Sequence, residues 1–189
     1  VDTSKAEVAR QAVEAGASLI NDVTALRNDP DMAPVVARAK VPVILMHMRG
    51  SPRTMQRAPR YHDVVEDVSE FLRHATRRAR DAGIASERLL IDPGLGFGKT
   101  VRHNLQLLRR LDVLQGLGYP IVLGPSRKSF LGRVLGVEVD DRLAGTLACV
   151  AWAASQHVAM VRVHDVKAAV DVLTTWRAIE SADAAGRQH

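Results

Sequence analysis

The sequence has one cysteine, few aromatic residues and no long apolar run. A single cysteine, Cys149, rules out a disulfide framework within the chain, which is typical of a protein of the reducing cytoplasm. Because Cys149 lies in an apolar helical segment, we expect an ordinary core residue rather than a reactive thiol. No apolar run approaches the length of a membrane span, and no cleavable signal pattern opens the chain. We therefore expect a cytoplasmic protein that makes no use of a membrane.

Aromatic residues make up only 4% of the 189-residue chain, although its net charge is +5. A nucleic-acid-binding surface would combine a basic stripe with aromatic side chains, so we expect no nucleic-acid partner. The arginines at 73, 77, 78 and 80 fall in one helical stretch and are interpreted as a solvated helix face. An anionic small molecule explains the positive charge equally well.

The usual metal and phosphate motifs are also missing. There is no cluster rich in His or Cys that would form a metal cage. Residues 98–100 supply the tail of a P-loop, but Pro93 stands where its first glycine belongs. A dinucleotide fingerprint counted from Gly94 and Gly96 needs a glycine at Lys99. What remains is a glycine loop whose backbone approaches something closely, beside a carboxylate.

That carboxylate, Asp92, ends a short apolar run from Leu89 to Ile91. Proline and repeated glycine follow at once, and neither continues a strand. We therefore expect a buried strand that stops at Asp92. Open and closed α/β sheets place ligand-binding groups at this carboxyl end of their strands.

Short apolar runs alternate with amphipathic helical stretches along the chain. We expect strands near 18–23, 41–47, 89–92, 120–124 and 159–164, and helices near 6–13, 31–39, 62–82, 103–117, 143–154 and 166–179. Ser4 is the expected N-cap of the first helix, and Asp140 or Asp141 that of the helix from Leu143. Nearly continuous apolar strands indicate a parallel sheet buried on both faces.

This alternation predicts an α/β fold, a (β/α)₈ TIM barrel that is incomplete here. A complete barrel takes about 250 residues, so the chain would run from the end of strand 3 through helix 8. The alternative, an open doubly wound sheet, fits the length better but lacks a first-strand phosphate loop. We expect one partial barrel domain over 1–180 and a disordered tail over 181–189. The long connection over 48–61 is expected to be either functional or disordered.

Polar side chains gather at the predicted strand ends, which meet at one mouth of a barrel: Asp2, Asn21, Met46, His47, Asp92, the turn 126–128, Arg162 and His164. Some have simpler explanations, since Asp2 and Asn21 could cap helices and His47 could be a satisfied core histidine. Two basic groups on one inward strand face, however, need an acceptor. Asp92 and Asn21 have the donors and acceptors to bind the edge of a flat heterocycle. Lys128 could reach a ring carbonyl or a second substrate. Arg162 and His164 offer hydrogen-bond donors suited to a diphosphate.

Several motifs resemble the dihydropteroate synthase family, in order along nearly the whole chain: Asp2-Thr3-Ser4-Lys5, Ile20-Asn21-Asp22, Leu45-Met46-His47-Met48, Asp92-Pro93-Gly94-Leu95-Gly96-Phe97-Gly98-Lys99, Gly124-Pro125-Ser126-Arg127-Lys128-Ser129-Phe130-Leu131-Gly132 and Arg162-Val163-His164-Asp165. The resemblance implies a (β/α)₈ barrel, usually a homodimer, acting in folate synthesis and inhibited by sulfonamides. Its reaction joins 6-hydroxymethyl-7,8-dihydropterin diphosphate to 4-aminobenzoate, giving 7,8-dihydropteroate and pyrophosphate, with Mg²⁺ assisting.

The resemblance also implies residue roles. The pterin-binding positions match Asp2, Asn21, Met46, Asp92, Phe97, Gly124 and Lys128. Lys128 and Ser129 match the aminobenzoate side, and Arg162 and His164 the diphosphate site; Asp92, Lys128, Arg162 and His164 are the expected catalytic residues. The family's first two βα units, with the Asn that holds Mg²⁺, have no counterpart here, so no metal ligand is expected in this chain.

Other interpretations stay open at this stage. We expect a piece of a longer chain, because Val1 and Asp2 are typical of a strand cut midway. One alternative is a corrinoid-linked pterin-binding methyltransferase, against which Arg162 and His164 argue. Another is a truncated, non-catalytic pterin-binding module.

Overall fold

The computed structural model describes residues 1–50, 55 and 59–182. The predicted tail therefore lies almost wholly outside the described residues, as does much of the predicted connection 48–61. The helices are α1 Ala6–Glu14, α2 Met32–Ala39, α3 Val64–Asp81, α4 Val101–Arg109, α5 Leu111–Gln115, α6 Ser129–Leu135, α7 Leu143–Ser155 and α8 Val166–Ser181. The strands are β1 Ile20–Asp22, β2 Val43–Met46, β3 Leu89–Asp92, β4 Val122–Leu123 and β5 Met160–Val161.

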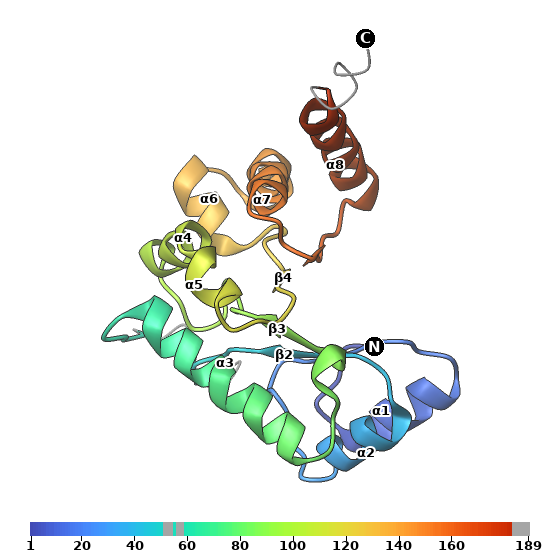
Figure 1. Cartoon of the computed structure of the whole chain (residues 1–189). Coiled ribbons are helices and arrows are strands. Elements are labelled where there is room, and N and C mark those ends of the chain that lie inside the picture. Colours follow the sequence, from blue (N-terminus) through green and yellow to red (C-terminus); the bar gives the residue numbers. More distant parts are fainter. Residues whose placement is uncertain (51–54, 56–58, 183–189) are drawn as a thin grey trace.

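The strands are parallel and follow one another in chain order. One sheet has the order β1-β2-β3 and the other is the pair β4-β5. Parallel bridges extend this series, from Asp2 to Asn21 at its start and from Ile91 to Ile121 between the two sheets. Consecutive parallel strands joined through helices are the arrangement of a (β/α)₈ barrel. All the strand carboxyl ends consequently lie at one edge, as Figure 1 shows for β2, β3 and β4.

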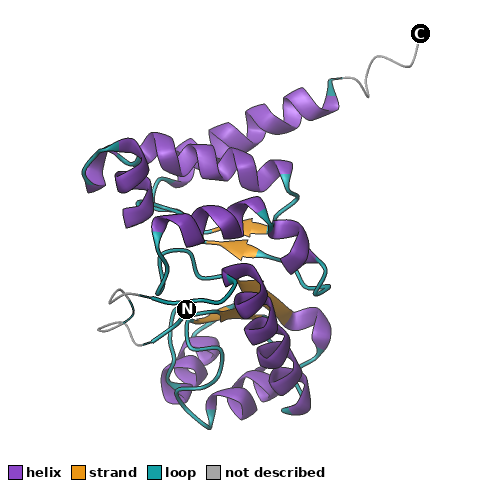
Figure 2. Cartoon of the chain, turned by 90° about the vertical axis from the view of Figure 1, so that its left-hand side faces the viewer, coloured by secondary structure: helices purple, strands orange, loops and turns teal. Residues whose placement is uncertain are grey.

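The helices cover the outside of the strands (Figure 2). Helix α3 contributes side chains to both hydrophobic clusters of the core. Its N-terminal half, including Val68 and Leu72, packs with residues of β3, α4, α5 and α7. Its C-terminal half, including Ala75 and Ala79, packs with residues of α1, α2, β1 and β2. A single long helix thus fixes the early strands relative to the later ones, and with them the mouth of the site.

The start of α3 offers a test of that role. Asp63 accepts hydrogen bonds from the Val65 and Glu66 backbone N–H groups, and these bonds hold its pKa below the ordinary value. We expect Asp63→Ala to lower the midpoint temperature of unfolding by about 3 °C, because helix N–H donors lose their cap. Calorimetric melting would measure it. The matched control is Asp31→Ala at the start of α2, where no side-chain cap bond exists; an equal shift there would contradict the assignment.

Several predicted helix boundaries were wrong. Ser4 does not cap α1: the cap residue is Lys5, and Asp29 accepts from the Ala6 N–H at 2.8 Å instead. Asp140 and Asp141 lie in a short 3₁₀ turn rather than capping α7. The predicted helix 103–117 is interrupted at Arg110 and divides into α4 and α5.

Two further differences concern the later units. Helix α6, which begins immediately after the basic turn at 126–128, was not predicted. The strand predicted over 159–164 contains only Met160 and Val161 as regular strand, so Arg162 and His164 follow it in a loop. Helix α4 starts at Val101 because Thr100 and His103 form a capping box there.

Two expectations about the burial of side chains are confirmed. Cys149 is buried, and burial raises the pKa of its thiol to about 11. The four arginines of α3 at 73, 77, 78 and 80 are exposed. None of the helices that the structure describes combines the length and apolar character needed to cross a membrane.

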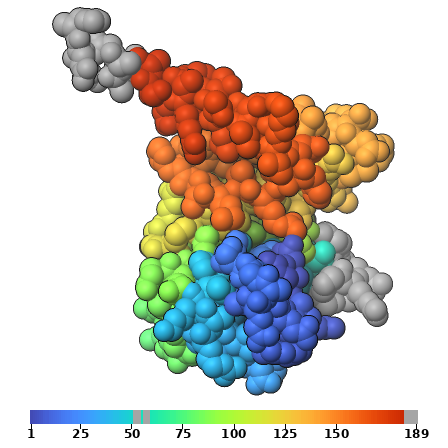
Figure 3. Space-filling model, turned by 90° about the vertical axis from the view of Figure 1, so that its right-hand side faces the viewer, coloured from blue at the N-terminus to red at the C-terminus, as the bar shows by residue number. Residues whose placement is uncertain are grey.

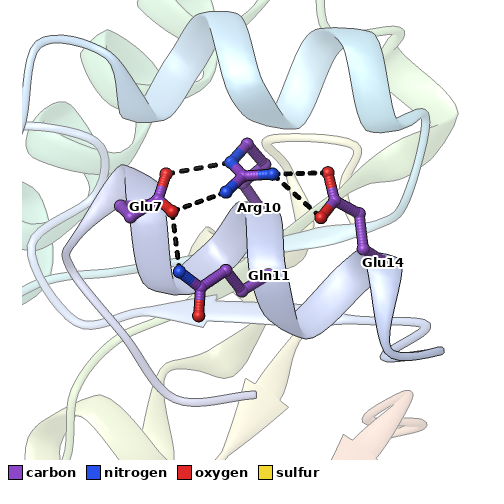
Figure 4. A network of polar contacts seen from close by, with 4 residues as sticks. All are labelled: Glu7, Arg10, Gln11 and Glu14. Carbon is purple, nitrogen blue, oxygen red and sulfur yellow. Dashed lines mark hydrogen bonds and ion pairs between the residues drawn. The ribbon is translucent and has the colours of Figure 1, made fainter.

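The outer face of α1 carries a separate ion-pair network (Figure 4). Arg10 bonds to Glu7 at 2.6 Å and to Glu14 at 2.7 Å, and Gln11 donates to Glu7. These side chains are largely exposed, so the network supports the helix locally and has little influence on overall stability.

Candidate active site

The site lies where the strands end, and Asp92 is at its centre. The carboxyl group is 7% exposed, and its Oδ1 accepts from the Gly94 N–H at 2.7 Å. Burial raises the pKa of Asp92 to about 6, against the lowering effects of that bond and of Lys99, Lys128 and Arg162. A buried carboxylate facing three cations is a group prepared to receive hydrogen-bond donors.

Phe97 and Lys128 form one wall of the site. The Lys128 Nζ lies 4.0 Å from the centre of the Phe97 ring, a cation–π contact. The Lys128 stem also runs so close to Gly96 that a Cβ there would meet its Cδ at 2.9 Å. Burial lowers the pKa of Lys128, while Asp92 raises it. The predicted pterin positions Asp92, Phe97 and Lys128 are therefore brought together.

A second group of predicted residues forms a chain of polar contacts. Asn21 Nδ2 donates to Asp2 Oδ1, and Arg162 Nη2 donates to Asp2 Oδ2 at 2.6 Å. These bonds, with the charge of Arg162, lower the pKa of Asp2, although desolvation acts most strongly and in the opposite direction. Asn21 Oδ1 is buried and has no hydrogen-bond partner among the described residues. A buried acceptor without a partner is costly, so this oxygen is available to a ligand N–H.

Ser126 positions His164, a role that sequence reasoning missed. The Ser126 Oγ lies 2.8 Å from His164 Nδ1 and accepts from the His164 backbone N–H at 3.1 Å. The Ser126 hydroxyl can also donate its own proton to His164 Nδ1. The neutral imidazole then carries its proton on Nε2, which is free to donate to another group. The sequence named 126–128 only as a basic turn and gave Ser126 no function.

The remaining predicted residues occupy different environments. Met46 is 2% exposed and packs beside Gly94. Gly124 is half-buried, and a Cβ there would meet nothing within 4 Å, so open space lies above it. Ser129 is exposed and begins α6. His47 is the satisfied core histidine that the simpler interpretation expected, with its Nδ1 2.9 Å from Lys99 Nζ.

Two buried polar residues outside the predicted set need an explanation. Asp22 is fully buried and accepts from the Leu26 N–H and from Thr24, which stabilises a turn with positive φ at Ala25 and Leu26. Lys99 is 4% exposed, and the sequence named it only within the two rejected glycine-loop patterns and at the end of the Asp92–Lys99 motif, with no role assigned to it. Asp22 therefore supports the site indirectly, while Lys99 lies within it.

The described residues contain no group of three His, Cys, Asp or Glu side chains placed to hold a metal ion. At the diphosphate side they present Arg162 and His164, whose nitrogen atoms are not the oxygen ligands that Mg²⁺ prefers. Among the described residues, this side of the site therefore does not fit an Mg²⁺ ion held by protein ligands alone.

Comparison with known proteins matches residues 1–164 to the family described as "Pterin binding enzyme". Dihydropteroate synthase of Escherichia coli K12 is 45% identical over 182 residues, which are 96% of this chain and 64% of that protein. The chain thus spans less than two thirds of the length of this curated relative.

Solved structures agree with the sequence matches. Yersinia pestis dihydropteroate synthase in a sulfonamide drug complex has a TM-score of 0.92 and 44% identity, covering 96% of this chain and 66% of that one. Xanthomonas albilineans dihydropteroate synthase in complex with 7,8-dihydropteroate has a TM-score of 0.89 and 48% identity, with the same coverage. The predicted fold class, an incomplete (β/α)₈ barrel, and the predicted family resemblance are both confirmed.

Proposed function

Because this chain belongs to the pterin-binding enzyme family, we propose that it carries the pterin and diphosphate sites of a dihydropteroate synthase. The reaction would join 6-hydroxymethyl-7,8-dihydropterin diphosphate to 4-aminobenzoate. The observation that carries the proposal is the set of polar groups at one end of the parallel strands: buried Asp92, Lys128 against the Phe97 ring, and Arg162 bonded to Asp2. The names and bound molecules of the relatives support the same activity.

The chemistry is a displacement at the exocyclic methylene carbon of the pterin. The bond from that carbon to the diphosphate oxygen breaks, and its electron pair leaves on pyrophosphate. The amine nitrogen of 4-aminobenzoate bonds to the same carbon and loses a proton. We propose a dissociative course in which no side chain forms a covalent bond, so the protein contributes binding, orientation and charge.

Asp92 and Asn21 would hold the pterin ring. An ionised Asp92 carboxylate accepts hydrogen bonds from the ring amino and N–H groups, and Asn21 Oδ1 is a buried acceptor still open to a ligand. Met46 and Gly124 would line the pocket, the latter leaving room for the ring. As the carbon–oxygen bond breaks, positive charge spreads onto the ring system, where the Asp92 carboxylate stabilises it.

Lys128 and Ser129 would form the aminobenzoate side, while Phe97 would line the pterin pocket beside them. The Lys128 ammonium already lies against the Phe97 ring, and it can reach a ring carbonyl of the pterin. Ser129, one residue on, is exposed toward solvent. By this proposal sulfonamides that mimic aminobenzoate would compete at the same side.

Arg162 and His164 would bind the diphosphate, where negative charge develops on the leaving group. Arg162 now bonds to Asp2, and a diphosphate would offer the guanidinium a more highly charged partner. We further propose that Mg²⁺ assists at the diphosphate, that the enzyme is a homodimer, and that it acts in the cytoplasm.

The diphosphate role gives a selective prediction. We expect Arg162→Met to weaken binding of the pterin diphosphate about ten- to a hundredfold, the cost of losing hydrogen bonds to a charged group. Binding of 6-hydroxymethyl-7,8-dihydropterin, which lacks the diphosphate, should change far less, because Arg162 lowers the pKa of Asp92 less than Lys99 and Lys128 do. Calorimetric titration of both ligands would measure the difference. An equal loss for both would contradict the assignment of Arg162 to the diphosphate.

The activity itself is tested by incubating the chain with the pterin diphosphate and 4-aminobenzoate and following 7,8-dihydropteroate. Product that disappears in Asp92→Ala supports the synthase. Pterin binding without turnover would indicate a non-catalytic pterin-binding module. A corrinoid-linked methyltransferase would bind a methylated pterin instead and have no need of Arg162.

A further inference from the structure

Lys99 is buried beneath the glycine loop that follows Asp92. Its Nζ lies 3.0 Å from the Gly94 carbonyl oxygen, 3.0 Å from the Phe97 carbonyl oxygen and 2.9 Å from His47 Nδ1. An ammonium group has three N–H donors, so these three acceptors match its full capacity. Two of them belong to the loop, and the third belongs to the end of β2.

His47 is prepared to accept from Lys99. Burial is the largest cause that lowers the pKa of His47 to about 2, and the charge of Lys99 adds to it. The imidazole is therefore neutral, and Nδ1 is an acceptor when Lys99 donates to it. Its ring packs edge-on against Phe71 of α3 with centroids 4.8 Å apart. The contact thus links the loop to β2 and, through Phe71, to α3.

The loop carries site residues on both sides of these contacts. The Gly94 N–H bonds to Asp92, while the Phe97 ring faces Lys128. Any displacement of the Gly94 or Phe97 carbonyl would move the adjoining group. We propose that Lys99 is a positioning residue, which fixes the loop so that Asp92 and Phe97 take their places in the pterin pocket. This inference rests on the proposed function, because it gives the loop a role in binding a pterin.

The charge of Lys99 gives its positioning role a consequence that can be measured separately from stability, the pKa of Asp92. The charged groups facing Asp92 are Lys99, Lys128 and Arg162, and each lowers its pKa. Lys99 itself faces Asp92 and Lys128, with burial lowering its pKa to about 7. Replacing Lys99 by an apolar residue removes one of the cations that keep Asp92 ionised, so the pKa of Asp92 should rise.

The test is titration with uncharged 6-hydroxymethyl-7,8-dihydropterin between pH 5 and pH 9. Wild-type affinity should rise with pH through about 6, as Asp92 ionises. Lys99→Met should bind about tenfold more weakly at pH 7, and its rise should move to higher pH. Lys167→Met is the matched control, since that side chain is 89% exposed on α8.

A pair of His47 variants covers the case in which Lys99→Met does not fold. His47→Leu removes one acceptor of Lys99, whereas His47→Asn keeps an amide oxygen near the position of Nδ1. We expect weaker binding in the first and affinity close to wild type in the second. Equal affinity in the two His47 variants would overturn the inference, as would a Lys99→Met chain with unchanged affinity and pH dependence. A wild-type chain that binds no pterin would instead overturn the proposed function.

Discussion

Asp92→Asn should abolish pterin binding and yet leave the chain at least as stable as wild type above pH 6. The amide oxygen can still accept from the Gly94 N–H, so the loop keeps its local bond. The charge is lost, however, and a carboxylate that accepts from two ring donors contributes about 3–6 kcal/mol. We expect affinity to fall at least about a hundredfold, as measured by calorimetric titration at pH 7.5.

The expected stability of the Asp92→Asn variant follows from the direction of the pKa shift of Asp92. Burial raises the pKa of Asp92 from 3.8 to about 6, so folding favours the protonated acid. That contribution is fully present below pH 3.8 and is lost as pH rises through 6, when the buried group must ionise. The difference is about 3 kcal/mol, which Asn, having no charge, does not incur.

Urea unfolding at pH 5 and pH 8 would measure this effect, with Asp171→Asn on exposed α8 as the matched control. We expect Asp92→Asn to exceed wild type at pH 8 by up to about 3 kcal/mol and by about half as much at pH 5, which lies between the unfolded and folded pKa values of Asp92. The control should follow wild type at both. A variant less stable than wild type at pH 8 would mean that Asp92 serves the fold rather than the ligand.

Gly94→Ala should lower the free energy of unfolding more than any other single methyl group added to the loop. Gly94 has φ +69°, and a Cβ there would lie 1.9 Å from the His47 carbonyl oxygen. That oxygen is backbone and cannot rotate away, so either the loop or β2 must shift. We expect a loss of at least about 3 kcal/mol, or no folded chain.

Gly16→Ala is the matched control for backbone strain alone. Gly16 has φ +100°, and a Cβ added there would meet nothing within 4 Å. We expect a loss of about 1 kcal/mol there, measured by the same urea unfolding. Similar losses at both glycines would show that the contact with His47 is not what fixes the loop.

The strand series could be predicted because each strand is a short apolar run that ends at a polar residue. Asp92, Asn21 and Arg162 were recognisable for the same reason, since each follows such a run. Helix α6 was not predicted, because the basic residues before it made the whole segment resemble a polar turn. The buried face of the helix includes Phe130 and Leu131. The pattern within one segment does not show what that segment packs against.

Contacts between distant segments also escaped prediction. Asp29 replaces Ser4 as the group that receives the first N–H of α1, and nothing in the local sequence shows this. Lys99 belongs to the site because His47 lies beside it, 52 positions away. Ser126 likewise acquires its role only when the last loop brings His164 to it. Composition and spacing name the candidates, while the fold decides which of them meet.

The bond between Asp2 and Arg162 has a kinetic consequence. It joins residues 160 positions apart, and Figure 3 shows the blue beginning of the chain beside the orange segment that precedes α8. Closing so long a loop costs entropy that an exposed ion pair of about 0–1 kcal/mol does not offset. The contact should therefore form late in folding and break early in unfolding. A ligand that engages both residues would slow the separation of the two ends, so occupancy of the site would lengthen the lifetime of the folded state.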